Sequence, residues 1–578
     1  MKKRFLSLLC VLALCLGLLP VTALAEENAP TTLYVGDQSL PVGQDSCWTT
    51  DANTGKLTEY TTGGDEWTVK YEPTSATLTL KNATIKGVVN AENIASAGIY
   101  AASSSAPVSL NIVLEGENKV SGGYGINVSS GGVASLSISG SGSLTVSATA
   151  TNGIGIFVQA QSGNANLAIN GANVNAVVTE TNGRGVELST GQAGNPNLTI
   201  EVKGGSLQAS GQPNGIKFFT NKNNTQANAN LKVSGNAMVK TSGITTDADG
   251  SGSQGAVLTT EAGSGETGGI VFDGSAGTVY GTVELQNDLT ISEGETLTIG
   301  DGASLNTGSH EVIVNGGTLT GNVTGEVTYK VTGVSLNKDS LTLDVGSSET
   351  LNATVAPNNA TNQKVTWTSN EERVATVDES GKVEAVAPGT ANITVTTQDG
   401  SHTATCAVTV TQPVTGVTLD PTSLSLFTGD TATLTATVEP ENATNKNINW
   451  SSDNTAVATV TNGTVTAVSA GKANITATAA DGGGVSATCT VTVTQSEYSI
   501  SADTTALDFG SAYTGYTQPA AQTVTITNTG NQSLTLNQPA STNSFEVGTL
   551  TKTALAAGEV ATFTVQPKAG LSVGTYSE

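Results

Sequence analysis

The sequence predicts an all-β chain, in which an N-terminal parallel β-helix-like solenoid, expected to be right-handed, precedes tandem β-sandwiches. Three observations lead to this fold class. Charged residues make up only 12% and aromatic residues 4% of the chain, while 67 glycines and abundant Thr, Val, Asn and Ser favour short strands joined by tight turns. No apolar pattern sustains the 3.6-residue period of a helix. Two separate internal repeats divide the chain.

The first 25 residues carry the pattern of a secretory signal peptide. A basic stretch, Lys2 to Arg4, precedes an apolar run from Phe5 to Leu19, and Ala23-Leu24-Ala25 supplies a small-residue cleavage site. The run is too short for a membrane-spanning helix. We therefore expect a secreted or extracellular protein without membrane insertion. A lipoprotein anchored at Cys15 is the alternative, although Leu14 stands where a lipobox requires a small residue.

The charge excludes two classes of partner. The formal net charge is −25, and because residues 1–25 carry three basic side chains and no acid, the remainder has −25 − 3 = −28. Nucleic-acid phosphates and anionic lipid surfaces both attract Lys and Arg, which are scarce here. We expect no nucleic-acid partner and no anionic membrane partner.

The first repeat predicts the solenoid. Its first strand begins with Gly followed by an apolar residue, at offsets of 27, 30, 30 and 30 residues: Gly98, Gly125, Gly155, Gly185 and Gly215. A second strand recurs once in each repeat, beginning at Leu110, Leu136, Leu167, Leu198 and Leu231. A third strand begins at Leu144 and Leu207. Three short strands per repeat are typical of a β-helix coil, and neighbouring coils stack at about 4.8 Å.

Period-two alternation assigns the faces of the first strand. Two apolar ladders are expected to point inward: Ile99, Ile126, Ile156, Val186 and Ile216, and Ala101, Val128, Val158, Leu188 and Phe218. An open coil would expose apolar core and strand edge, so the stack needs a cap. We assign residues 26–84, with Trp48, Trp67 and Tyr71, to this cap. Residues 85–327 form the solenoid, with shorter closing strands after Gly255.

Three segments of this half resemble exported β-helix proteins of Clostridia-type bacteria that contain a carbohydrate-binding domain. The segments are residues 48–53, 76–85 and 113–118, and the resemblance spans roughly residues 31–325. It implies sugar binding and attachment to the cell surface of a Gram-positive-type bacterium.

The second repeat has an offset of 83 residues. Thr332-Gly333-Val334-Ser335-Leu336 recurs at residues 415–419, Trp367 recurs as Trp450, and Cys406 recurs as Cys489. Each copy is a run of short alternating strands, which suits a β-sandwich of about seven strands. The Trp of each copy is expected to be buried as its large core residue; an exposed, sugar-binding Trp is the alternative. One Cys per copy excludes a disulfide within a copy, so a small buried side chain is expected there.

These copies resemble the group 2 bacterial Ig-like domains, which also occur in invasin- and intimin-type adhesins. The shared pattern is the opening Gly-Val-Ser/Thr-Leu, the Trp-Ser/Thr-Ser strand, Val-Ala-Thr-Val and Gly-Xaa-Ala-Asn-Ile-Thr. We assign residues 328–412 and 413–495 to tandem Ig-like β-sandwiches. The resemblance implies a surface stalk or adhesion module without catalytic residues.

A third module is expected at residues 496–578. Leu507-Asp508-Phe509-Gly510 and residues 524–530 resemble a further Ig-like family, found in spindle- and cilia-associated proteins. The sequence stops at Glu578, about one strand before this module is expected to close, so we expect the module to be incomplete.

One row of residues is the candidate binding site. The positions between the two inward ladders must face away from the core: Tyr100, Asn127, Phe157, Glu187 and Lys217. Stacked coils place them in a line of aromatic and polar groups. Such a line suits a polysaccharide, because rings stack on sugar faces and amides bind hydroxyl groups. The alternative is an ordinary solvated face with a Glu187–Lys217 ion pair.

The sequence offers no catalytic or metal site. Glu115 and Glu117 share a face, as the paired carboxyls of a glycoside hydrolase must, but we expect no basic partner beside them. His310 and His402 fall in different domains, which excludes a His-based triad. Residues 51–53 and 247–250 match calcium loops only in part and are expected to be turns. No cofactor is expected.

We therefore expect a non-enzymatic, adhesin-like surface protein, with a carbohydrate-binding face on the solenoid and Ig-like modules as a stalk. The expected partners are a polysaccharide or a host or cell-wall glycan, and other surface proteins. A purely structural cell-wall protein is the alternative, and a polysaccharide lyase or hydrolase is the less favoured one.

Overall fold

The computed structural model describes residues 28–61, 64, 66–87, 96–191, 195–220, 227–248, 257–262 and 267–578. The predicted signal peptide, with Cys10 and Cys15, lies outside the described residues. The chain is nearly all-β, as predicted. Within the described ranges, the one helical segment is the single 3-10 turn η1 (Pro73–Ser75).

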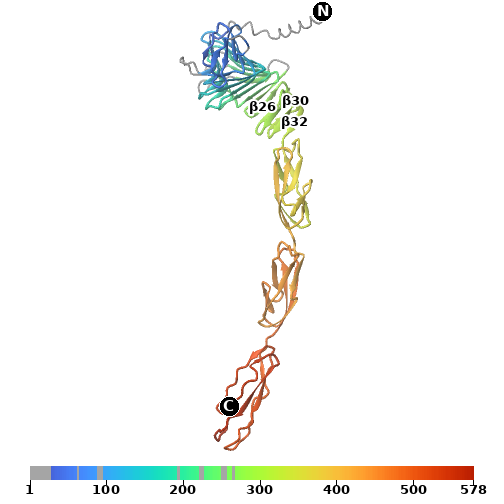
Figure 1. The fold of residues 1–578 in the computed structure, drawn as a ribbon. Helices are drawn as coiled ribbons and strands as arrows, with labels where there is room; N and C mark the ends of the chain where they lie inside the picture. Colours follow the sequence, from blue (N-terminus) through green and yellow to red (C-terminus); the bar gives the residue numbers. More distant parts are fainter. Residues whose placement is uncertain are drawn as a thin grey trace. The chain divides into compact units, whose positions relative to one another are not determined.

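Residues 32–320 form a β-solenoid whose coils contribute strands to three sheets (Figure 1, blue to green). Sheet A has eight strands, in the order β2 (Gln38–Ser39), β1 (Thr32–Val35), β8 (Ala97–Ser103), β11 (Tyr124–Ser130), β14 (Ile154–Ala160), β17 (Arg184–Thr190), β20 (Ile216–Thr220) and β23 (Ile244–Ala248). From β8 to β23 the pairing is parallel, as a solenoid requires.

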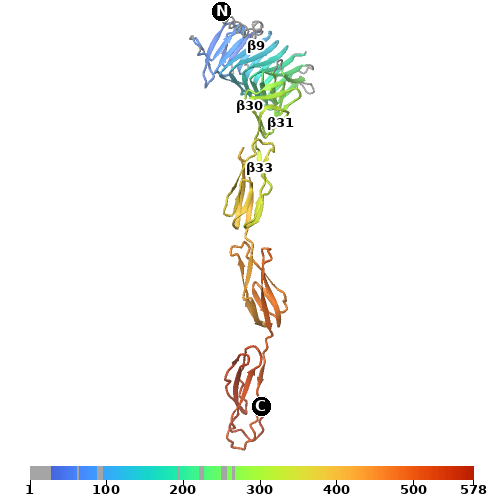
Figure 2. The ribbon, with the colours of Figure 1, turned by 90° about the vertical axis from the view of Figure 1, so that its right-hand side faces the viewer.

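Sheets B and C have ten strands each. Sheet B runs β24 (Val257–Ala262), β21 (Asn228–Ser234), β18 (Asn197–Lys203), β15 (Ala165–Asn170), β12 (Ala134–Gly140), β9 (Val108–Glu115), β6 (Thr77–Lys81), β5 (Val69–Glu72), β3 (Ser46–Thr50) and β4 (Leu57–Glu59). Sheet C runs β31 (Thr318–Thr320), β29 (Thr296–Ile299), β26 (Ala276–Tyr280), β25 (Gly269–Asp273), β22 (Ala237–Thr241), β19 (Ser206–Ser210), β16 (Asn173–Val177), β13 (Ser143–Ala148), β10 (Glu117–Gly122) and β7 (Thr84–Lys86). Figure 2 shows the strands stacked as successive rungs.

Both predicted inward ladders of sheet A are confirmed. Each pairs in register from coil to coil, and all ten side chains are fully buried. The repeat glycines before these ladders have a steric reason. A Cβ on Gly125 would lie 2.5 Å from the carbonyl oxygen of Gly155, and a Cβ on Gly155 would lie 2.6 Å from that of Gly185. Only Gly lets successive coils approach this closely.

The predicted alignment of the second strand is wrong at one coil. Leu167 of β15 pairs with Ile200 of β18, not with Leu198, which pairs with Ala165. The next coil follows the same register, because Ile200 pairs with Leu231. The third-strand alignment is confirmed, since Val174 pairs with both Leu144 and Leu207.

The N-terminal end of the solenoid is closed by antiparallel strands. β1 runs antiparallel to β8, and β5 runs antiparallel to β6. Trp48 and Tyr71 are buried there, while Trp67 is half-buried with Lys81 Nζ 5.6 Å from its ring centroid. Antiparallel strands at this end use the hydrogen-bonding edge that a first coil would otherwise leave free.

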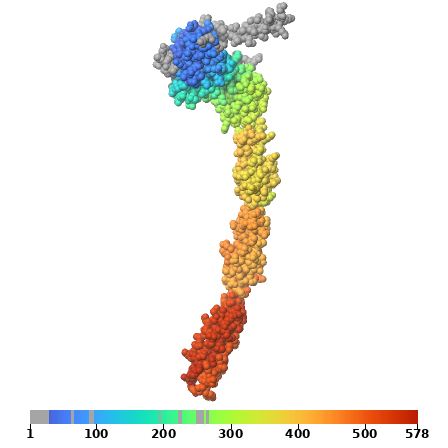
Figure 3. Space-filling view, viewed as in Figure 1, coloured from blue at the N-terminus to red at the C-terminus, as the bar shows by residue number. Residues whose placement is uncertain are grey.

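Beyond β25 the chain reverses. β26 runs antiparallel to β25, and a four-stranded sheet forms from β27 (Thr282–Glu284), β28 (Leu289–Ser292), β30 (Ser304–Asn315) and β32 (Val323–Tyr329). β28 and β29 are short, as predicted after Gly255, but β30 has 12 residues. A separate apolar cluster that includes Phe272, Ile291 and Leu297 fills this end. Figure 3 shows the outer face of this part of the chain in green.

The two repeat copies that follow have the same strand order. The first consists of β33 (Gly333–Leu336) with β36 (Ala353–Ala356); β34 (Ser340–Asp344), β41 (Thr403–Thr411), β40 (Gly389–Thr397) and β37 (Val365–Ser369); and β35 (Ser348–Thr350), β39 (Lys382–Ala385) and β38 (Ala375–Val377). The second consists of β42 (Gly416–Asp420) with β45 (Thr435–Glu439); β43 (Ser423–Phe427), β50 (Ser486–Thr494), β49 (Gly471–Ala479) and β46 (Ile448–Ser452); and β44 (Thr431–Thr433), β48 (Thr464–Ala467) and β47 (Ala458–Thr461). Each therefore has nine strands rather than about seven.

The predicted burial of the two Trp side chains is wrong in degree. Trp367 and Trp450 face the apolar clusters of their copies but are only half-buried. Each ring lies over a glycine: a Cβ on Gly381 would lie 2.8 Å from Trp367 Cζ2, and one on Gly463 would lie 3.2 Å from Trp450 Cζ2. The fully buried residues include Cys406 and Cys489, which are free thiols as predicted, and burial raises their pKa.

The third module contains a four-stranded antiparallel sheet of β51 (Ile500–Ala502), β52 (Gln522–Asn528), β56 (Val560–Pro567) and β54 (Phe545–Val547), and a pair, β53 (Leu534–Thr535) with β55 (Ala554–Leu555). Residues 524–528 of the predicted second motif lie in β52. The first motif, residues 507–510, forms no strand, but its Phe509 ring lies 5.7 Å from that of Phe545.

Candidate functional site

The five predicted site residues lie in one row of sheet A. Asn127 is the register partner of Tyr100 and of Phe157, Phe157 is the partner of Glu187, and Glu187 is the partner of Lys217. The row continues to Tyr34 at the cap and to Thr245 at β23. Because each residue sits between two inward side chains on its strand, the row faces away from the apolar core.

The row is less exposed than a solvated face would be. Tyr100 and Phe157 are half-buried, but Asn127 and Glu187 are 7% exposed and Lys217 is 9% exposed. Strand alternation predicts the direction in which each side chain points, but not how far it is exposed. Side chains at neighbouring rungs stand about 4.8 Å apart, so large rings and long charged side chains cover the shorter ones between them.

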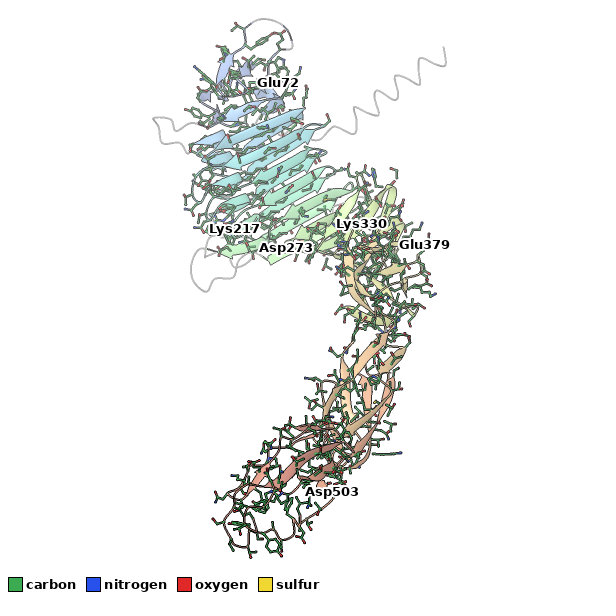
Figure 4. The ribbon with its side chains drawn as sticks, turned by 60° about the horizontal axis from the view of Figure 1, so that its bottom comes forward. Glu72, Lys217, Asp273, Lys330, Glu379 and Asp503 are labelled. Atoms are coloured by element: carbon green, nitrogen blue, oxygen red, sulfur yellow. The ribbon has the colours of Figure 1, made fainter. Side chains whose placement is uncertain are left out.

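The expected Glu187–Lys217 ion pair is not formed. Glu187 Oε2 lies 3.1 Å from Arg184 Nη1 on its own strand, and Lys217 Nζ lies 2.7 Å from Asp247 Oδ2 on the next coil. Lys217 Nζ also lies 5.0 Å from the Phe219 ring centroid. Figure 4 labels Lys217 among the stacked strands of the solenoid. The charges of the row are therefore balanced locally.

Burial raises the pKa of two groups in the row. It raises the pKa of the Glu187 carboxyl above 4.5, opposed by the positive charges of Arg184 and Lys217 and supported by the negative charge of Asp247. Burial also raises the pKa of the Tyr100 hydroxyl. Both groups thus hold their protons more tightly than they would in water.

Sequence reasoning missed the residues that flank the row. The Tyr124 ring stacks on that of Phe157 with centroids 5.8 Å apart and planes 26° apart. Tyr124 and Arg184 each precede a repeat glycine and stand three residues before a predicted site residue. Their shared position in the 30-residue repeat was the signal that could have identified both.

The predicted absence of a basic partner for the paired acids is wrong. Glu115 is the register partner of Lys81, on the neighbouring strand of sheet B. Glu115 and Glu117 are both exposed at strand ends. Asp51 forms a turn, as predicted: its Oδ1 accepts hydrogen bonds from the backbone of Asn53 and Thr54. The second calcium-like segment lies partly outside the described residues, at 249 and 250.

Within the described ranges, His, Cys, Asp and Glu side chains nowhere gather in groups of three or more that could hold a metal ion. Nor does any helix there have the length and apolar character to span a membrane.

Comparison with known proteins identifies the repeat copies. The bacterial Ig-like domain (group 2) model matches residues 330–408 and 413–491, so the chain contains two domains of this group after its solenoid. An uncharacterized protein of Clostridium acetobutylicum is 37% identical over 144 residues, which are 25% of this chain and 15% of that protein. The Ig-like virion protein of Serratia phage KSP90 is 45% identical over 107 residues, 17% of this chain and 42% of that protein.

Two other matches are shorter or have lower sequence identity. Lacto-N-biosidase of Bifidobacterium bifidum is 44% identical over 90 residues, 15% of this chain and 8% of the enzyme. A crystal structure of domains 4 and 5 of the S-layer protein SbsC aligns with 28% of this chain and 98% of that chain, at 24% identity and a TM-score of 0.15. The chain spans less than half the length of these curated relatives.

Proposed function

We propose that this chain is a non-enzymatic, exported protein of the bacterial cell surface that binds glycans along the outer face of sheet A. The Ig-like domains serve as spacers between the solenoid and the cell wall. Group 2 Ig-like domains favour a surface role, because they resemble adhesin modules. A glycan ligand is favoured by a similar segment in lacto-N-biosidase, an enzyme whose name indicates action on a glycan.

The observation that supports glycan binding most directly is the combined chemistry of the row. Three aromatic rings, those of Tyr100, Tyr124 and Phe157, surround the strand position of the Asn127 amide. Rings offer flat apolar surface to sugar faces, and an amide supplies directional hydrogen bonding, so together they suit a sugar better than either does alone.

The test is a glycan array probed with the full chain and two alanine variants. We expect Phe157→Ala to weaken every positive signal, because the ring is part of the proposed face. Tyr498→Ala is the control: this Tyr is exposed in the third module, far along the sequence from sheet A. No binding by the unaltered chain would favour the purely structural alternative, and equal loss in both variants would show that binding does not depend on this face.

The absence of catalysis has its own test. We expect incubation with pectins, xylans and other polysaccharides to release neither reducing ends nor unsaturated sugars, because Glu115 and Glu117 are exposed at strand ends. Product formation that disappears in Glu115→Gln or Glu117→Gln would show an enzyme instead.

A further inference from the structure

Three polar atoms of the site row are buried without a hydrogen-bond partner. They are Asn127 Oδ1, Glu187 Oε2 and Thr245 Oγ1. The Arg184 guanidinium lies near the Glu187 oxygen as an ion pair, but outside hydrogen-bond geometry. A buried polar atom without a partner costs about 1 to 3 kcal/mol. Three such atoms in one row indicate a face built to be completed by a ligand.

The three atoms occupy alternate rungs. Asn127, Glu187 and Thr245 are separated by Phe157 and Lys217, so each lies two strands from the next. With strands about 4.8 Å apart, the interval is about 9.6 Å. An extended β-1,4-linked glycan presents the same ring face at every second sugar, at a repeat of similar length. A chain lying along the solenoid axis would therefore meet each position with the same chemical group.

The surroundings of Asn127 indicate which chemical group of the ligand would bind there. Asn127 Oδ1 and Glu187 Oε2 accept hydrogen bonds, so the ligand must donate, which disfavours the carboxylates of uronic acids. Arg184 and Lys217 already supply positive charge beside Glu187, which disfavours an ammonium group. The rings of Tyr100, Tyr124 and Phe157 add apolar surface around Asn127. An acetamido group has both features, because one N–H donor stands next to an apolar methyl.

We propose that the outer face of sheet A binds a β-1,4-linked glycan bearing C2 acetamido groups, with Asn127 and Glu187 accepting hydrogen bonds from sugars two residues apart. This specificity rests on the proposed function and narrows it to one ligand class. Chitin and the glycan strands of bacterial cell walls share this chemistry.

Three hexasaccharides that share a β-1,4-linked backbone and differ in the group at C2 test which of these groups the protein prefers. N-acetylchitohexaose carries acetamido groups, the chitosan hexamer carries ammonium groups, and cellohexaose carries hydroxyl groups. In calorimetric titration of the full chain, we expect the acetylated hexamer to bind at least about tenfold more tightly than either of the others, which lack the N–H donor and methyl together. Separate pull-downs with purified chitin and purified peptidoglycan distinguish the two sources.

A matched pair of variants tests the residue. Asn127→Leu removes the acceptor and keeps the volume, and should weaken the acetylated hexamer by at least about tenfold. Asn175→Leu is the control, because Asn175 Oδ1 is also buried without a partner, but on sheet C. Neither change removes an existing hydrogen bond of that oxygen, so neither variant should melt at a lower temperature than the unaltered chain.

The outcomes separate this proposal from the broader one. If cellohexaose binds as tightly as the acetylated hexamer and binding depends on Phe157, the face binds glycans but the acetamido specificity is wrong. Equal affinity of the Asn127→Leu variant and the unaltered chain would also overturn it. If none of the hexamers binds and the glycan array is negative, the proposed function itself fails.

Discussion

At the residue scale, strand alternation decides which side chains share a row, but not how far solvent reaches them. Ile156 and Phe157 are adjacent, and their predicted opposite directions agree with the structure. The low exposure of Asn127 and Glu187 depends on the size of neighbours 30 residues away, such as Phe157 and Lys217, and on Tyr124 and Arg184. A single strand carries no such information, so the row was predictable and its burial was not.

The opposite faces of β14 predict unequal losses of stability. Ile156→Asp should destabilise the solenoid by more than about 4 kcal/mol, because an unpaired carboxylate would enter an apolar ladder. Phe157→Ala should cost about 1 to 2 kcal/mol, from the lost ring pair with Tyr124 and half-buried area. Urea unfolding followed by hydrogen exchange of β14 measures both. Comparable losses would show that the register of sheet A is wrong.

Glu187 predicts a pH dependence of local stability. Because the folded state raises the pKa of this acid, the folded state binds the proton more tightly than the unfolded chain does. This contribution is fully present below the ordinary value of 4.5 and is lost as pH rises through the raised pKa. After correction for intrinsic rates, β17 amides should be better protected from exchange at pH 5 than at pH 7. The Glu187→Gln variant should lose this difference, and an unchanged difference would assign it to another group.

At the scale of elements, the one alignment error has a physical cause. The predicted pairing of Leu167 with Leu198 differs from the observed pairing with Ile200 by two residues. A shift of one residue would have turned every side chain to the other face, but a shift of two leaves the faces unchanged. The apolar pattern therefore fixed the core of β18 without fixing its register. The nine strands of each Ig-like domain were missed because several of them have only three or four residues, too few for a clear alternation of their own.

The half-buried Trp of each Ig-like domain should contribute less than a fully buried one. We expect Trp450→Ala to cost about 2 to 3 kcal/mol, below the roughly 3 to 5 kcal/mol of a fully buried ring. Gly463→Ala should also destabilise, because φ is +82° at this position and the added Cβ would press on the same ring. Chemical denaturation of both variants, with iodide quenching of the native chain, measures these effects. A native spectrum that iodide cannot quench would indicate full burial.

The segment that enters each Ig-like domain is held by one Thr and one Asp side chain of that domain, at equivalent positions in the two domains. In the second domain, Thr444 Oγ1 accepts a hydrogen bond of 2.7 Å from Gln412 N, and Asp481 Oδ2 accepts one of 2.7 Å from Val414 N. Thr361 and Asp399 make the equivalent bonds in the first. Asp481→Asn should therefore increase protease cleavage at residues 412–414. Asp453→Asn is the control, since Asp453 accepts a backbone bond from Asn474 inside the domain. Equal cleavage of both variants would contradict this role.

At the scale of the whole molecule, the solenoid and the two Ig-like domains have separate apolar cores. The solenoid cluster and the clusters of the two Ig-like domains contain no residue in common. Repeats in the sequence predicted this modularity, because each copy carries a complete apolar pattern. The third module was less predictable: its residues 507–510 form no strand, although their motif resembles one.

Separate cores predict separate unfolding. Ile475 is fully buried in the second Ig-like domain, so Ile475→Asp should abolish the folding of that domain. Because the solenoid core has no residue from this domain, its transition should keep its midpoint in scanning calorimetry, and glycan binding on sheet A should be unchanged. Ile156→Asp should do the reverse, removing the solenoid transition and leaving those of the Ig-like domains. If Ile475→Asp lowered the midpoint of the solenoid or weakened its glycan binding, the domains would be coupled parts of one binding unit, and the role of spacer would no longer describe them.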